Sequence, residues 1–506
     1  MGDVSILDIA RRRGFFWPSF EIYGGVAGFY TYGPLGALLK LRIEKLIRDY
    51  FVNKEGCLLL DAPMLTPEEP WVASGHVESF TDMNIECMKC GEAYRADLLL
   101  EEKTGKSAEG MSLKEMLDAV KKAGIRCPKC GGELGKPYDY NLMFWTFIGP
   151  GKSRIAGCLR PETAQTTYMP FKRLFELGRK KLPLGVIQVG KSYRNEISPR
   201  QGLIRLREFS QAEAQFFFDP HDKERHPKFD TVKRKKLAVL TKSDQKRNRK
   251  EKVMDVAGLV KKKHANEWIA YFLAVSIDMF RQMGIDGKKL RCRQHQDDER
   301  SFYSSDTWDI EYMSDVFGKI ELVGVADRTD YDLKRHQQFS GQKMSVTVEG
   351  RSFIPHVVEV AYGIDRPVYC VVESSLRKDG DRVYFAFPPS VSPYQVAVFP
   401  LVRKDGLPGQ ARDVYDALNA AGFYALYDEG FIGKLYYRQD EAGTPFCVTI
   451  DYDTKKDKSV TVRDRDNQRQ IRVKIKDLVD VISHVMNGQI KFEKAGIPLK
   501  PYGARV

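Results

Sequence analysis

The sequence predicts an α+β protein with several domains, and three observations lead to this prediction. Residues 185–220 alternate between apolar and polar side chains, which indicates two antiparallel strands joined by a turn. Two C-x-x-C cysteine pairs lie within residues 86–136, which indicates a small inserted module. After residue 389, apolar runs alternate with segments of helical periodicity, which indicates a separate α/β domain.

The composition is that of a globular protein of 506 residues, 42% of them hydrophobic and 29% charged. No apolar run reaches the length of about 18 residues that a membrane-spanning helix needs. The first residues also lack the apolar core of a signal peptide. Four of the nine cysteines have metal-binding spacing, which favours reduced thiols over a disulfide framework. We therefore expect a cytoplasmic protein without a membrane contact.

The first segment of the chain predicts a long helix followed by a short strand. The sequence YGPLG at 32–36 indicates a turn that leads into a helix. Apolar residues then recur at helical spacing, at Leu39, Ile43, Leu46, Ile47 and Tyr50. The apolar run 57–60 indicates a strand that ends at DAP. This pattern alone indicates ordinary core packing.

The two cysteine pairs predict a metal site. Cys87 and Cys90 are separated from Cys127 and Cys130 by 36 residues, and a glycine follows each pair. Four thiolates on two tight turns can close a tetrahedral zinc site. Because such a site has no open coordination position, we expect structural zinc without a catalytic role. A helix is expected between the pairs, near residues 113–123.

The polar face of the predicted hairpin 185–220 has the composition of a nucleotide site. Arginine forks suit phosphate oxygens, an aromatic ring suits a base, and carboxylates suit an ammonium group. The turn itself is expected at residues 198–202. The face combines three arginines, two carboxylates and one ring: Arg194, Arg205, Arg207, Glu196, Glu213 and Phe209.

A basic segment follows the hairpin. The net charge of the chain is +13, and residues 231–252 alone hold ten basic and two acidic residues. Such a run is commonly a solvated surface, and the alternative is an electrostatic contact with a nucleic-acid backbone. The sequence leaves both open. With a helix expected at 266–283, we predict a mostly helical insertion at 219–290.

The amino-acid sequence of the hairpin resembles that of a known family. Arg194-Asn-Glu, followed by Arg205 and Phe209, resembles motif 2 of class II aminoacyl-tRNA synthetases, and RNEISPRQGLIRLREF resembles the glycyl-tRNA synthetases of archaeal and eukaryotic type. The helix and strand at 34–63 resemble motif 1, which forms the dimer interface in that family. The segment 355–373 resembles motif 3. The three motifs also occur in the same order as in that family.

This resemblance implies an ATP site with Mg²⁺. Arg194 and Arg366 would be catalytic through phosphate binding. His295 has no nucleophile partner in the sequence, and we interpret it as a structural histidine. The implied ATP-binding residues are Arg194, Asn195, Glu196, Arg205, Leu206, Phe209, Glu321, Leu322 and Arg366.

The resemblance also implies a glycine site. The sequence RPETAQ at 160–165 resembles a family segment whose glutamate lies in the amino-acid pocket. The implied glycine-binding residues are Glu162, Glu213, Glu359, Val360 and Ala361. Val360 and Ala361 stand where the family usually has Pro and Ser, and Thr166 where it has Gly. Two alternatives therefore remain: a class II synthetase for another small amino acid, or an RNA-binding paralogue that does not aminoacylate.

The C-terminal segment resembles the anticodon-binding domain of the glycine, histidine, proline and threonine enzymes. We expect strands at 395–402, 425–428, 446–451 and 459–463, and helices at 410–421, 433–442 and 476–487. The implied partners are tRNA(Gly), ATP, glycine and a second copy of the chain. The expected domains are catalytic segments at 1–85, 137–218 and 291–388, a zinc insertion at 86–136, a helical insertion at 219–290 and an anticodon-binding domain at 389–506.

Overall fold

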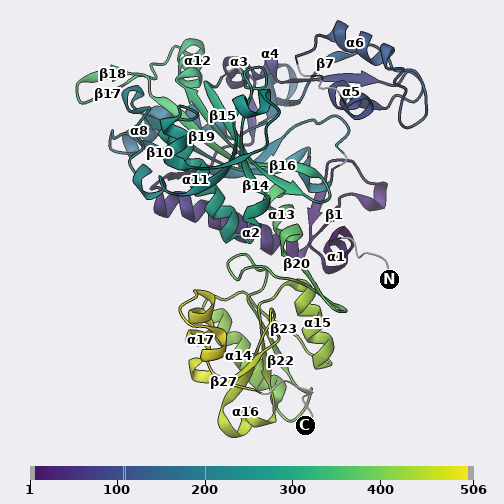
Figure 1. Cartoon of the computed structure of the whole chain (residues 1–506), viewed down its shortest axis with the longest axis vertical. Coiled ribbons are helices and arrows are strands. Elements are labelled where there is room, and N and C mark those ends of the chain that lie inside the picture. Colours follow the sequence, from purple (N-terminus) through teal and green to yellow (C-terminus); the bar gives the residue numbers. More distant parts are fainter. Residues whose placement is uncertain (1–5, 106–107, 109, 200, 302, 500–506) are drawn as a thin grey trace.

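The computed structural model describes residues 6–105, 108, 110–199, 201–301 and 303–499. The predicted domain ends 1–5 and 500–506, and Arg200 of the predicted turn, lie outside these residues. Figure 1 shows a large N-terminal body and a smaller C-terminal domain beneath it. Among the described helices, none has both the length and the apolar character needed to cross a membrane.

The N-terminal body is built on a nine-stranded sheet in the order β13-β12-β14-β15-β16-β19-β11-β10-β3. Antiparallel pairing dominates, and only β12 with β14 and β10 with β3 are parallel in this described sheet. The strands span Lys252–Asp255 (β13), Lys236–Leu240 (β12), Leu290–Gln294 (β14), Asp306–Ser314 (β15), Gly318–Thr329 (β16), His356–Gly363 (β19), Glu208–Phe218 (β11), Leu184–Tyr193 (β10) and Leu58–Leu60 (β3). The predicted antiparallel hairpin is therefore confirmed as β10 and β11.

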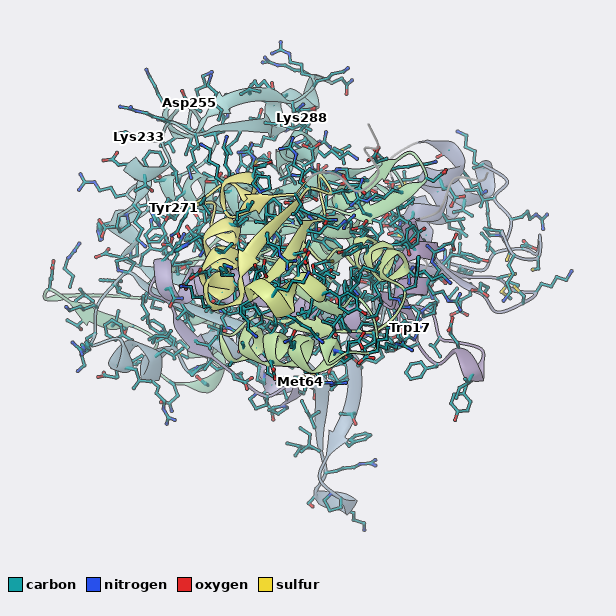
Figure 2. The ribbon with its side chains drawn as sticks, turned by 90° about the horizontal axis from the view of Figure 1, so that it is seen from below. Trp17, Met64, Lys233, Asp255, Tyr271 and Lys288 are labelled. Atoms are coloured by element: carbon teal, nitrogen blue, oxygen red, sulfur yellow. The ribbon has the colours of Figure 1, made fainter. Side chains whose placement is uncertain are left out.

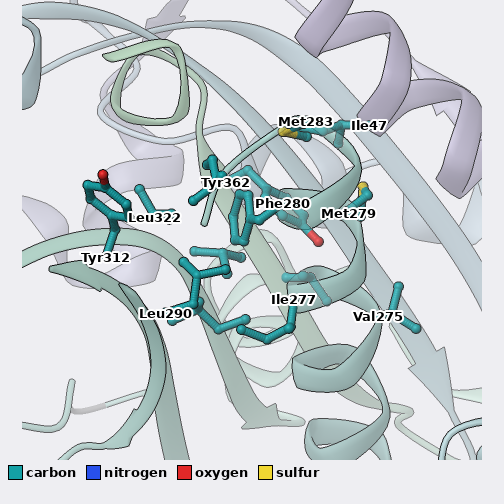
Figure 3. Close-up of a cluster of buried hydrophobic side chains, with 14 of the residues drawn as sticks. Ile47, Val275, Ile277, Met279, Phe280, Met283, Leu290, Tyr312, Leu322 and Tyr362 are labelled. Carbon is teal, nitrogen blue, oxygen red and sulfur yellow. The ribbon is translucent and has the colours of Figure 1, made fainter. Parts of the chain in front are cut away.

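Apolar helices cover one face of this sheet. They are α2 (Pro34–Asp49), α11 (Glu267–Gln282) and α13 (Asp365–Ser375). Figure 3 shows Phe280 of α11 beside Tyr362 of β19. Met283, directly after α11, and Ile47 of α2 lie nearby. Because this face is closed by the hydrophobic core, a ligand site on the sheet has to use the opposite face.

The hairpin strands are shorter than predicted. Tyr193 is paired with Glu208, and the strands end there. Arg194, Glu196, Arg205 and Arg207 therefore lie on the connecting loop, beyond the paired strands, and not on a regular strand face. The loop is shaped by a 3₁₀ turn at Gly202–Ile204 and by Ser198, whose φ of 46° is left-handed.

Helices predominate over strands in the segment 219–290, but β12 and β13 also extend the main sheet, and these two strands were not predicted. The apolar run KLAVL interrupts the basic run, and Leu237 and Val239 are buried. The helices of this segment are α9 (Lys242–Lys246), α10 (Val256–Lys261) and the buried α11. In Figure 2, the labelled Lys233, Asp255 and Lys288 lie at the margin of the molecule opposite Met64.

The residues between motif 1 and the hairpin form two small sheets. Residues 81–141, here called the cysteine module, contain β5 (Thr81–Glu86), β6 (Ala93–Arg95), β7 (Tyr138–Asn141), α5 (Ala96–Thr104) and α6 (Leu113–Lys122). The module has its own apolar core, which includes Cys87 and Cys127. The second sheet contains β4 (Leu65–Pro67), β8 (Phe144–Ile148) and β9 (Ile155–Leu159).

Several shorter elements complete the N-terminal body. Those near the open face are α3 (Glu69–Ser74), α4 (His76–Ser79), α7 (Ala164–Tyr168), α8 (Phe171–Leu177) and α12 (Tyr331–Ser340). The others are α1 (Ile6–Arg13), β1 (Phe16–Pro18), β2 (Tyr30–Tyr32), β17 (Val346–Val348), β18 (Arg351–Phe353), β20 (Leu376–Asp379) and β21 (Arg382–Phe385).

The C-terminal domain has a six-stranded sheet in the order β23-β22-β24-β25-β26-β27. The first three strands are parallel, and the rest are antiparallel. This confirms the predicted α/β domain and adds β26, β27 and α16, which were not predicted. The elements are β22 (Val396–Pro400), α14 (Leu407–Ala420), β23 (Ala425–Tyr427), α15 (Ile432–Ala442), β24 (Phe446–Ile450), α16 (Tyr452–Asp457), β25 (Ser459–Asp464), β26 (Gln470–Lys474), α17 (Leu478–Met486) and β27 (Ile497–Pro498).

Candidate active site

A cleft of about 250 Å³ lies on the open face of the main sheet. Its floor comes from β11, β16 and β19, and its rims come from the loops before β11 and before β15. The cleft brings together most of the predicted site residues: Glu162, Arg194, Glu196, Arg205, Leu206, Phe209, Glu213, Glu321, Glu359, Ala361 and Arg366. Residues that are up to about 200 positions apart in the sequence thus meet in one cavity.

The three arginines of the cleft are held by neighbouring groups. The Arg366 Nη1 atom, on the first turn of α13, donates to the Glu321 carbonyl at 3.0 Å and lies 3.2 Å from its carboxylate. The Arg194 guanidinium lies 5.3 Å from the Phe80 ring and 5.4 Å from the Phe209 ring. Arg205 Nε donates to the Glu196 carboxylate at 2.6 Å. This half of the cleft therefore holds positive charge beside an aromatic surface.

Three predicted residues do not present side chains to the cleft. The Asn195 amide donates to the Tyr140 hydroxyl at 2.5 Å, outside the cavity. Leu322 and Val360 are buried in the core on the other face of the sheet. Only the backbone of these two residues can therefore contact a ligand on the open face.

A β-bulge explains which residues of β16 face the cleft. On β15 the adjacent residues Ile310 and Glu311 pair with Val323 and Glu321. Leu322, between these two, therefore has no partner of its own. Leu322 and Val323 both enter the core. The bulge consequently places Glu321 on the same face as Gly324 and Ala326.

The other half of the cleft is strongly acidic. Glu213 is buried and accepts hydrogen bonds from the Thr163 backbone at 2.9 Å and from its hydroxyl at 2.5 Å. Burial, together with the carboxylates of Glu359 and Glu162, raises the pKa of Glu213 to about 8. Burial also raises the pKa of Glu359. Such a cluster of carboxylates is suited to bind a cation.

A buried arginine holds the acidic cluster in place. Arg328 Nη1 donates to the Glu359 carboxylate at 3.1 Å, and Nε donates to Asp332 at 2.8 Å. Although burial opposes ionisation, His76 and then Arg328 keep the pKa of Glu162 below its usual range. Arg328 was not identified as a site residue from the sequence. Without the bulge, strict alternation along β16 would place Arg328 and Glu321 on opposite faces of the sheet.

His295 and Asp309 also line the cleft, although neither was predicted as a site residue. The His295 Nε2 atom lies 2.7 Å from Asp309 Oδ2. Burial and the nearby Glu321 raise the pKa of Asp309 to about 6. This contact links the loop before β15, which carries His295, to the half of the cleft that holds the arginines. No sequence spacing linked His295 to a reacting group, which is why it was interpreted as structural.

The comparisons with known proteins decide the family. A model described as the tRNA synthetase class II core domain (G, H, P, S and T) matches residues 152–237, and an anticodon-binding domain model matches residues 395–484. A glycine–tRNA ligase of Methanococcus maripaludis is 43% identical over 94% of this chain and 98% of the relative. The chain belongs to the glycine–tRNA ligase family. Glycine–tRNA ligases of Methanocaldococcus jannaschii and Pyrococcus horikoshii are each 42% identical, over 94% and 95% of this chain and 98% of each relative.

Membership of the glycine–tRNA ligase family confirms the resemblance seen in the sequence. The class II core match contains the hairpin of β10 and β11, and the anticodon-binding match contains β22 to β26 of the C-terminal sheet. The cleft therefore lies in the class II catalytic core of a ligase-family chain.

The cysteine module of this ligase-family chain gathers four thiols. The sulfur atoms of Cys87, Cys90, Cys127 and Cys130 all lie within 4.8 Å of one another. The distance between Cys87 and Cys130 is 3.5 Å, and that between Cys90 and Cys127 is 3.7 Å. A tetrahedral zinc with Zn–S bonds of about 2.3 Å requires sulfur–sulfur distances of about 3.8 Å. The four predicted ligands thus have the arrangement that such a metal needs.

Proposed function

We propose that this protein activates glycine with ATP and transfers it to the 3′ end of tRNA(Gly). In the first step a glycine carboxylate oxygen attacks the α-phosphorus of ATP, and the bond to pyrophosphate breaks. In the second step the 3′-hydroxyl of the terminal adenosine attacks the glycyl carbonyl, and AMP leaves. The observation that carries this proposal is a single cleft with three arginines at one end and three buried glutamates at the other.

The arginine end would hold the nucleotide. Arg194 would bind the α-phosphate, where negative charge builds during the first step, while Arg205 and Arg366 would bind the outer phosphates. Phe209 would stack on adenine, and Glu196 would accept from its exocyclic amine. Catalysis would then consist of positioning and charge neutralisation, and no protein nucleophile would be needed.

The acidic end would hold the glycine ammonium group. Glu162, Glu213 and Glu359 contribute carboxylates, and Ala361 contributes a small wall. With its ammonium held there, the carboxylate of glycine would point toward Arg194 and the α-phosphate. Rejection of larger amino acids would come from the size of this end, because binding alone distinguishes one methylene by only about 1–3 kcal/mol.

Two metal ions belong to this proposal. Glu321 and Asp309 present carboxylate oxygens to the cleft, and such ligands suit the Mg²⁺ that accompanies ATP. Bound there, Mg²⁺ would neutralise charge on the phosphate oxygens. The four thiols of the cysteine module would hold a structural Zn²⁺, which would stabilise the module and take no part in catalysis.

We further propose a cytoplasmic homodimer that binds tRNA through its C-terminal domain. Motif 1 would form the dimer interface. Its strand β3 is one of the two edge strands of the main sheet, and Leu59 there is 56% exposed. Four of the nine cysteines are grouped as metal ligands and not as disulfide partners, which supports a reducing compartment.

A panel of amino acids in ATP–pyrophosphate exchange tests the proposal against its alternatives. Exchange with glycine alone supports the proposed reaction. Exchange only with another small amino acid supports the second candidate, which the Ala361 departure motivates; Val360 gives it little support because its side chain lies in the core. Absence of exchange with every amino acid supports the RNA-binding paralogue, against which the arginines of the cleft argue.

A further inference from the structure

The cysteine module and the two residues that flank it, Phe80 and Leu142, contact the loop 194–207 at several described residues. Asn195 contributes a backbone amide that donates to the Leu142 carbonyl at 2.7 Å and a side chain that donates to Tyr140. The Ser198 hydroxyl donates to the Ala93 carbonyl. The Phe80 ring, next to β5, lies under the Arg194 guanidinium. The loop that carries the phosphate-binding arginines is therefore packed against a separately folded module.

Among the contacts between the module and this loop, that of Asp82 reaches a charged group of the cleft, the guanidinium of Arg205. Its Oδ2 atom lies 2.9 Å from Arg95 Nη1 and 3.4 Å from Arg205 Nη2. The side chains of Asp82 and Arg205 are 16% and 21% exposed, so water only partly screens the pair. Arg205 is thus held between Glu196 on its own loop and Asp82 on the module.

We propose that Asp82 is a positioning residue for the activation step, through which the cysteine module fixes Arg205 in the orientation that binds the outer phosphates of ATP. The inference rests on the proposed function and adds to it a role for the module. Glu196 alone holds Arg205 through Nε, which leaves the guanidinium free to rotate about that contact. The second carboxylate at Nη2 fixes the plane of the guanidinium, and bidentate recognition of phosphate depends on that plane.

The sign of the effect separates positioning from simple electrostatics. Removing a negative charge near the phosphate site would by itself strengthen the binding of anionic ATP. Loss of a positioning contact would weaken it. A rise in the KM for ATP after Asp82→Asn is therefore a result that charge repulsion cannot produce.

The experiment is a double-mutant cycle in ATP–pyrophosphate exchange with the full chain, together with calorimetric titration by Mg·ATP. Asp82→Asn should raise the KM and Kd for ATP by about threefold to tenfold. This loss lies between that expected for an exposed ion pair and that expected for a buried, charge-assisted hydrogen bond. In an Arg205→Ala background the same substitution should have no further effect. Asp139→Asn, at an exposed position on the same small sheet, is the control and should leave ATP binding unchanged.

Three outcomes would overturn the positioning role. These are an unchanged or lowered Kd for ATP in Asp82→Asn, an equal effect with and without Arg205, or a loss of kcat and melting temperature without a change in Kd. Asp82→Glu keeps the charge and should restore ATP binding, which covers the case in which Asp82→Asn folds poorly. Absence of exchange in the unmodified protein would refute the proposed function, whereas the calorimetric comparison would still decide the role of Asp82.

Discussion

Glycine binding should release a proton from the acidic end of the cleft. Glu213 has a pKa of about 8 because it is buried and faces the carboxylates of Glu359 and Glu162. Arg328 only partly offsets this repulsion, and Thr163 stabilises the ionised form through two hydrogen bonds. An ammonium group bound between the carboxylates would favour the ionised form and displace the proton.

The size of the effect follows from this pKa. At pH 7 a carboxyl group with a pKa of about 8 is about nine-tenths protonated, so glycine should release about 0.9 proton on binding. Because the protonated form must lose its proton first, the dissociation constant of glycine should rise about tenfold for each pH unit below 8 and level off above it. Acidification therefore weakens glycine binding.

Calorimetric titration with glycine in buffers of different ionisation enthalpy measures this proton directly. Glu213→Gln should abolish the release and should also raise the glycine requirement. Glu208→Gln, at the partly exposed start of the same strand, provides the control and should leave the release unchanged. If binding at pH 7 released no proton, or if Glu213→Gln released as many as the unmodified protein, the reasoning about this cluster would be wrong.

Three further predictions concern catalysis, metal and packing. Arg194→Ala should lower the rate of ATP–pyrophosphate exchange by about 10²–10³-fold, the usual loss when a group that stabilises developing charge is removed, and normal exchange would exclude that role. Cys127→Ser should lose zinc, measured by metal analysis, and expose the cysteine module to proteolysis; full zinc content would contradict the four-thiol site. Gly36→Ala should lower the melting temperature and cost about 1–3 kcal/mol, because its Cβ would lie 1.7 Å from the Phe15 carbonyl oxygen. Gly409→Ala is the control: it lies at an exposed position of α14 where a Cβ meets nothing within 4 Å, so it should not lower the melting temperature, and equal effects would argue against this packing.

The sequence predicted the hairpin but not where its strands end. Alternation of polar and apolar residues continues through Arg194 and Arg205, although the strands end at Tyr193 and Glu208, with one further backbone hydrogen bond from Arg194 to the Arg207 carbonyl. A periodic pattern reports which way side chains point, and it carries no information on whether a partner strand is still present. The 3₁₀ turn and the contacts with the cysteine module hold this loop, and both depend on residues distant in sequence.

The missed site residues have separate causes. Arg328 was overlooked because a bulge at Leu322 breaks the two-residue period of β16, and no local pattern signals such an insertion. Asp309 lies on the regularly alternating strand β15, and no spacing in the sequence linked it to the other site residues. The same bulge directs the side chain of Leu322 into the core, whereas Val360 lies there through the regular alternation of β19, in which Glu359 and Ala361 face the cleft. The basic segment 231–252 was misjudged in another way: its charges concealed the short apolar strand around Leu237.

The charge balance of the acidic end explains how so small a ligand could be held. Arg328, 1% exposed, contacts Glu162, Glu359 and Asp332, and His76 lies 3.4 Å from Glu162. Even with His76 protonated, these two cations cannot neutralise the three carboxylates together with Glu213. Breaking such a buried set by removing one partner is costly, so the cluster is fixed, and its excess charge can be met only by a proton or by a cation. Glycine offers no side chain, and its ammonium is the group that can replace that proton. We infer that the cluster binds through charge, while the narrow end beside Ala361 limits the size of what accompanies that charge.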